Sequence, residues 1–149
     1  MENNLKVNPV ADHISEWSRM FSSSENLRSE LDFCEDELTF LHKLIDKYFM
    51  HLMEDESLHT LNKISTRLHK TEENRKELET SNNRIMQKIG LLLENPFSQN
   101  EHQIKDSFNV TFSHVHEFQI GLRTLKSEIF EILEKSLRTE KGRKLLGHQ

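Results

Sequence analysis

The chain has 149 residues, enough for one domain with a sizeable core, and 25 acidic against 20 basic residues give it a net charge of −5. Only four glycines and two prolines occur, so we expect few turns and long elements. Residues 1–60 hold 13 acidic and 5 basic residues (−8), whereas residues 61–149 hold 12 and 15 (+3). Neither half has the concentrated basic face of a nucleic-acid-binding protein, and we expect no nucleic-acid partner.

The cysteine content and the hydropathy both predict a soluble, cytoplasmic protein. Cys34 is the only cysteine, so no intramolecular disulfide can form, which indicates a reducing compartment. The first residues, MENNLKVNPVAD, lack the basic and apolar regions of a signal peptide. Apolar runs stay well short of the roughly 20 residues that span a bilayer, and we expect no membrane association.

The first predicted helix covers about residues 9–53. Asn8 followed by Pro9 is a typical helix start. Ser22 and Glu25 could cap a separate helix, but the heptad phase continues through the serines, and we predict one continuous or gently kinked helix. Its apolar positions step by three and four: Trp17, Met20, Ser24, Leu27, Leu31, Cys34, Leu38, Leu41, Ile45, Tyr48 and Leu52. Four further residues widen this face and predict more than one neighbouring helix: Phe33, Phe40, Leu44 and Phe49.

A second heptad pattern, out of phase with the first by two residues, predicts a helix over about 57–93. Its positions are Leu61, Ile64, Leu68, Thr71, Arg75, Leu78, Asn82, Ile85, Ile89 and Leu92. ENPF at 94–97 interrupts the pattern, because a residue before proline disfavours helix. A third helix is predicted over about 97–141, with 142–149 as a frayed tail. Its positions are Ile104, Phe108, Thr111, Val115, Phe118, Leu122, Leu125, Ile129 and Ile132.

These patterns predict an all-α fold with one helical domain over residues 1–149. Short connections between long helices make neighbouring helices antiparallel. We therefore expect an elongated antiparallel three-helix bundle with coiled-coil-like heptad packing. A helical hairpin that dimerises into a larger bundle is the alternative.

The stretch HLMEDESLH, residues 51–59, combines two histidines with three acidic residues at the first predicted turn. Glu56 and His59 form an E-x-x-H pair, the spacing that di-iron helical bundles use. Such bundles need two pairs and two further glutamates, and only one pair is found here. We expect a solvated turn with no bound metal, and the candidate ligands for a metal site are His51, Glu56 and His59.

No other motif indicates chemistry. A glycine-rich phosphate loop and a nucleophile-elbow motif are both missing from the sequence. Cys34 lies on the apolar seam, where it is expected to be a small buried hydrophobe. Trp17 and the nine phenylalanines are expected to lie largely in the core. We expect no catalytic residue and no cofactor.

The register can also be predicted by counting outward from turns near residues 55 and 96. Asn82 comes level with Thr111 and within one turn of Ser24, which predicts a polar layer that fixes the alignment of the helices. Trp17 comes level with Leu92, Leu93 and the start of the third helix, beside Phe97.

A charged residue on an apolar seam needs a partner, because an unpaired buried charge is costly. The same counting places Arg75 near Glu35 and Glu117. We predict that one of these two glutamates pairs with it.

The block LDFCEDELTFLHKLID, followed by a second amphipathic helix, resembles small uncharacterised helical-bundle proteins of flavobacteria over about residues 10–93. The resemblance implies no activity and no site. We expect a non-enzymatic helical scaffold or protein–protein interaction module, with a protein partner or self-association, such as a homodimer, through its helical faces. A metal-binding helical bundle, with di-iron or zinc held by histidine and acidic clusters, is the alternative.

Overall fold

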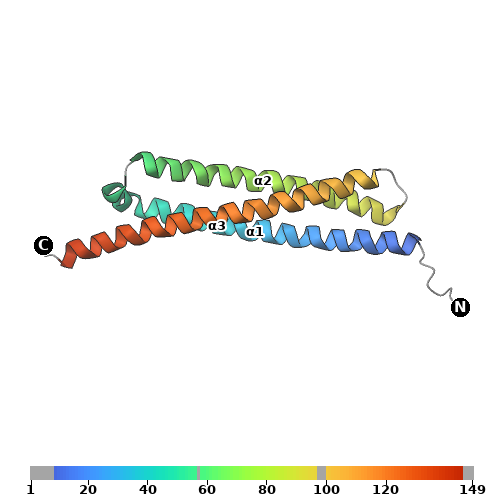
Figure 1. Cartoon of the computed structure of the whole chain (residues 1–149), viewed down its shortest axis with the longest axis horizontal. Helices are drawn as coiled ribbons and strands as arrows, with labels where there is room; N and C mark the ends of the chain where they lie inside the picture. The colour runs from blue at the N-terminus through green and yellow to red at the C-terminus, as the bar shows by residue number, and fades with distance from the viewer. Residues whose placement is uncertain (1–8, 57, 97–99, 146–149) are drawn as a thin grey trace. The chain divides into compact units, whose positions relative to one another are not determined.

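The computed structural model describes the backbone of residues 9–56, 58–96 and 100–145. It describes the side chains over 11–54, 56, 58–96 and 100–139. The described chain forms three helices and no strand (Figure 1): α1 (Pro9–Asp55), α2 (Leu58–Glu94) and α3 (Glu101–Leu145). Every pair of helices is in contact, so the fold is an all-α three-helix bundle, as predicted.

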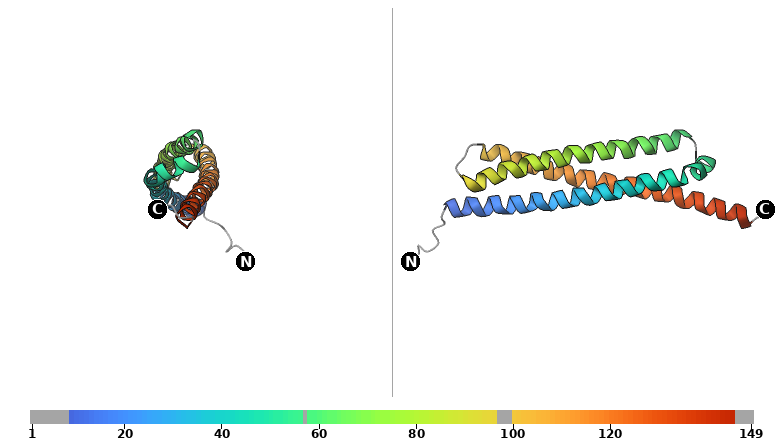
Figure 2. Two further views of the ribbon diagram at one scale, coloured as in Figure 1. Left: turned by 90° about the vertical axis from the view of Figure 1, so that its left-hand side faces the viewer. Right: turned by 180° about the vertical axis from the view of Figure 1, so that it is seen from behind.

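The contacts divide the chain into two compact units, and each unit contains a segment of all three helices. Unit 1 comprises Met1–Asp32 and Lys76–His116, and unit 2 comprises Phe33–Arg75 and Glu117–Gln149. Figure 1 shows the three segments of unit 1 (blue, yellow and orange) side by side, and Figure 2 shows the same segments from behind.

Within each unit, α1 and α2 are antiparallel. In unit 1, Trp17 packs with Ile89, and Ser24 accepts a hydrogen bond from Asn82. Residue numbers in α2 therefore fall as those of their partners in α1 rise. In unit 2 the same order is given by two side-chain contacts between α1 and α2, Glu35 with Arg75 and His42 with Glu72. The α1 and α3 segments of unit 2 run in the same direction, as two further ion pairs show: Glu37 with Lys126, and Glu56 with Lys135.

The three heptad patterns face the core. Every position of the three patterns is buried except five half-buried ones: Met20, Tyr48, Thr71, Phe108 and Ile132. Burial at steps of three and four follows from the near-seven-residue repeat of two helical turns. Within the described ranges, no helix has an apolar stretch long enough to cross a membrane.

The helix bounds differ from the expected ones mainly in α3. α1 is continuous through Ser22–Ser24, as favoured. α3 begins four residues later than expected, because Asn100 has a φ of 74° and its carbonyl accepts the first helical bond, from the Ile104 amide at 3.0 Å. Asparagine tolerates this left-handed backbone better than most residues. α3 also continues past Gly142 to Leu145, since one glycine weakens a helix without ending it.

The phenylalanines do not lie largely in the core, contrary to the expectation. Trp17 is fully buried, but Phe118 is the one buried phenylalanine among the described side chains. Four others are 42–63% exposed: Phe33, Phe40, Phe112 and Phe130. A helix in a three-helix bundle buries a limited arc, and Phe33 lies two positions, or about 200°, from the buried Leu31. Phe97, expected beside Trp17, lies outside the described residues.

Candidate functional site

The three candidate metal ligands near the first turn, His51, Glu56 and His59, each have different neighbours. His51 is half-buried, with its ring centroid 6.3 Å from that of Tyr48. The Glu56 carboxylate lies 3.4 Å from the Lys135 ammonium, and His59 is exposed. Among the side chains that the structure describes, no three His, Cys, Asp or Glu residues gather into a group that could hold a metal ion.

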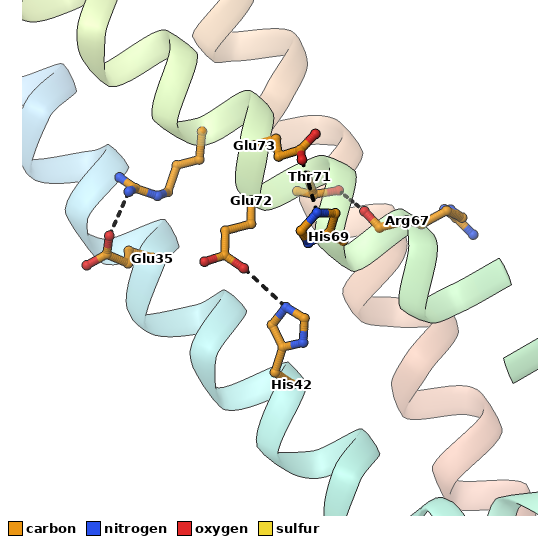
Figure 3. Close-up of polar contacts among 8 residues, drawn as sticks. Glu35, His42, Arg67, His69, Thr71, Glu72 and Glu73 are labelled. Atoms are coloured by element: carbon orange, nitrogen blue, oxygen red, sulfur yellow. Dashed lines mark hydrogen bonds and ion pairs between the residues drawn. The ribbon is translucent and has the colours of Figure 1, made fainter. Parts of the chain in front are cut away.

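Other histidines pair with single glutamates. In unit 2, His42 Nε2 of α1 lies 3.4 Å from Glu72 Oε2 of α2, and His69 Nε2 lies 3.0 Å from Glu73 Oε1 one turn along α2 (Figure 3). In unit 1, His13 Nδ1 lies 2.9 Å from Glu101 Oε1. Tetrahedral metal sites use three or four protein ligands, whereas each of these contacts joins one histidine to one glutamate between or along helices.

A polar layer lies inside unit 1, as the register predicts. The Asn82 side-chain amide donates to the Ser24 backbone carbonyl at 2.8 Å, and both residues are buried. Thr111 is also buried, and it lines one surface depression together with Ser81 and Ile85 of α2. These two residues lie one position before and three positions after Asn82. Asn82 Oδ1 and Ser24 Oγ are buried without a hydrogen-bond partner among the described residues. We predict that this layer fixes the alignment of the helices at a cost in stability.

We expect Asn82→Leu to raise the free energy of unfolding by about 1–2 kcal/mol, because it removes a buried amide whose oxygen lacks a donor. The same change should reduce structural uniqueness, since a polar residue on a seam specifies register. Urea denaturation followed by circular dichroism measures the first effect, and the number of backbone amide signals in an NMR spectrum measures the second. Asn83→Leu, on an exposed neighbour, is the matched control. A less stable Asn82→Leu variant with one set of signals would contradict the prediction.

The buried arginine in unit 2 has the partner that the register allows. Arg75 Nη2 lies 2.6 Å from Glu35 Oε2, so one of the two predicted glutamates forms the pair (dashed line at Glu35 in Figure 3). The arginine side chain is 3% exposed, whereas the glutamate is 56% exposed. The charge therefore meets its partner at the bundle surface while the aliphatic stem lies in the core.

The remaining feature is an exposed apolar surface between α1 and α3 of unit 2. Lys126 Nζ donates to Glu37 Oε2 at 2.5 Å, which identifies the faces of α1 and α3 that lie next to each other. Residues three, four and seven apart share one face of a helix. Four large apolar residues that are not buried lie at such spacings from Glu37 or Lys126: Phe33 (63% exposed), Phe40 (53%), Leu44 (half-buried) and Phe130 (42%). Leu137 (44% exposed) lies seven residues after Phe130 and continues the α3 side. These five residues are called the α1/α3 strip.

The two sides of the α1/α3 strip are level with each other. Phe40 lies three residues after Glu37, and Phe130 lies four residues after Lys126. Because α1 and α3 run in the same direction here, both rings come one helical turn beyond the ion pair. The sequence indicated the α1 half, which widens the first apolar face, and missed Phe130 and Leu137. Their seven-residue spacing was the available signal.

No protein-family model, curated protein or solved structure matches this chain. The fold and the surface together define an all-α three-helix bundle with an exposed, heptad-spaced apolar strip. The likeness to flavobacterial helical proteins stays a prediction.

Proposed function

We propose that the protein is a non-enzymatic helical interaction module that binds a protein chain through the α1/α3 strip of unit 2. The observation that carries the proposal is the exposure of three phenylalanine side chains and one leucine at helical spacing on adjoining helix faces. Contiguous exposed apolar patches mark interaction sites, and aromatic residues are enriched at the centres of interfaces. A partner that covers the strip removes this apolar area from water, which favours binding.

The charges around the strip suit an interface. Glu37 and Lys126 are paired beside the rings, and Lys47 and Arg123 lie seven residues after Phe40 and seven before Phe130. An apolar centre with a charged rim is the usual arrangement of a protein–protein interface. Anchors at seven-residue spacing fit the face of another helix. The proposal includes a cytoplasmic location, which the presence of a single, buried cysteine, Cys34, supports.

Photo-crosslinking tests the proposal, because the chain offers three exposed phenylalanines of similar exposure. A benzoyl-phenylalanine is placed at Phe40 or Phe130 in the strip, or at Phe112, which is 48% exposed in unit 1. The full chain is irradiated in cells that produce it, and the products are separated and weighed by mass spectrometry.

We expect positions 40 and 130 to give the same discrete adduct and position 112 to give none. This result requires one partner that covers both sides of the strip. Equal adduct yields at all three positions would indicate random collision, and no adduct at 40 and 130 would leave the strip without a partner. Either outcome overturns the proposed function.

A further inference from the structure

The partner of the strip can be named from its charges, an inference that rests on the proposed function. We propose that the α1/α3 strip binds the same strip of a second copy of this chain. In this dimer the α1 segments are antiparallel to each other, and so are the α3 segments. The two-fold axis passes beside Phe40 and Phe130, the level centre of the strip. Most soluble homo-oligomers are two-fold dimers of this self-complementary kind.

The charges of α3 are complementary under this symmetry. When two copies of a helix cross antiparallel at Phe130, a residue before the crossing faces the residue equally far after it in the partner. Lys126 lies four residues before Phe130 and Glu134 lies four residues after it. The dimer therefore has a lysine opposite a glutamate on both sides of the axis. Arg123 and Leu137, seven residues to either side, place an arginine stem against an apolar side chain.

The charges of α1 follow the same symmetry about Phe40. Glu37 and Lys43 lie three residues to either side, so opposite charges again face each other twice. Phe33 and Lys47 lie seven residues to either side, which brings an ammonium group to an exposed ring. None of these pairs opposes like charges, and charge complementarity of this kind specifies a partner and its direction.

The same-direction arrangement fits less well. A two-fold axis along the helices would set α1 of one copy against α3 of the other. Glu37 would still face Lys126, but the α3 charges at 126 and 134 would no longer meet. In the antiparallel arrangement, every charged residue named above except Arg123 faces either an opposite charge or an aromatic ring.

The first test is the mass of the full chain in solution, measured by sedimentation equilibrium over a concentration series. We expect twice the 17.7 kDa of one chain. Phe40→Glu and Phe130→Glu should each raise the dimer dissociation constant at least about 30-fold, the effect of losing a central aromatic anchor. Phe112→Glu should leave it unchanged. Far-UV circular dichroism checks that each variant keeps its helices.

The second test is the direction of pairing, measured by disulfide formation. Residues 126 and 134 are about 12 Å apart on one helix, beyond the roughly 7 Å between Cα atoms that a disulfide spans. The double variant Lys126→Cys/Glu134→Cys therefore oxidises to a covalent dimer only if position 126 meets position 134 of the other copy. Each single variant controls for the buried Cys34, and Arg123→Cys/Glu131→Cys has the same spacing without the symmetry about Phe130.

The outcomes separate this inference from the proposed function. A chain that is monomeric at every concentration, or a dimer that Phe40→Glu does not weaken, overturns the inference. A dimer that Phe40→Glu weakens but that gives no disulfide in the 126/134 variant overturns the antiparallel arrangement. If the adducts at positions 40 and 130 contain a different protein, the strip is still an interaction surface and the self-association is wrong. If those adducts are missing, the proposed function fails as well.

Discussion

Replacing Trp17 with alanine is expected to lower the free energy of unfolding by about 3–5 kcal/mol, the range for truncating a large buried aromatic residue. Trp17 is fully buried in unit 1. It packs in one cluster with four buried residues from α2 and α3: Ile85, Ile89, Leu92 and Ile104. The Lys105 ammonium lies 5.6 Å from the ring centroid, so the substitution also removes a cation–π contact. Urea denaturation followed by far-UV circular dichroism measures the change.

Ile14→Ala is the control for Trp17→Ala, because Ile14 lies on the same helix and is 39% exposed. We expect its effect to stay within about 1 kcal/mol. Trp17 is the only tryptophan, so in the natural chain its fluorescence reports on unit 1 while circular dichroism reports on all helices. Coincident transitions would show that the units unfold together. A denaturation midpoint that is the same for Trp17→Ala and the natural chain would contradict the packing described here.

The prediction of the fold from the sequence succeeded because burial in a helical bundle imposes a simple period. Steps of three and four mark the face that neighbouring helices can cover, so the three patterns identified the core directly. The register followed from counting residues between two turns. It placed Asn82 within one helical turn of Ser24, and Arg75 near Glu35 and Glu117, of which Glu35 is the partner in the structure.

The sequence failed where apolar residues outnumber the positions that the bundle can cover. Phe33 and Phe40 were expected to meet more than one neighbouring helix, yet both are more than half exposed in this chain. Hydrophobicity alone does not distinguish an apolar residue in the core from an apolar residue on the surface, because both have the same side chain. Exposure decides between them, and exposure depends on how α1 and α3 pair around Glu37 and Lys126. The start of α3 was missed for a local reason, the left-handed backbone of Asn100.

Arg75→Ala is expected to lower the free energy of unfolding by about 2–4 kcal/mol, because it truncates a long buried side chain. The loss arises mainly from the stem, because the arginine side chain is 3% exposed. Arg75→Met keeps a side chain of similar length and removes the charge. We expect this variant to stay within about 1 kcal/mol of the natural chain, because replacing a buried ion pair by an apolar side chain is often neutral. Urea denaturation of both variants separates packing from charge.

Glu35→Ala tests the other half of the pair. Its carboxylate is 56% exposed, so water screens the ion pair and we expect a loss of no more than about 1 kcal/mol. A loss as large as that of Arg75→Ala would mean that the guanidinium depends on this one carboxylate and that the charge, not the stem, dominates. In that case Arg75→Met in the Glu35→Ala background would recover stability, because no buried charge would be left without its partner. From the burial of the two side chains we expect Arg75→Ala to have a much lower free energy of unfolding than Glu35→Ala. The free energy of unfolding of Arg75→Met should be the closest to that of the natural chain.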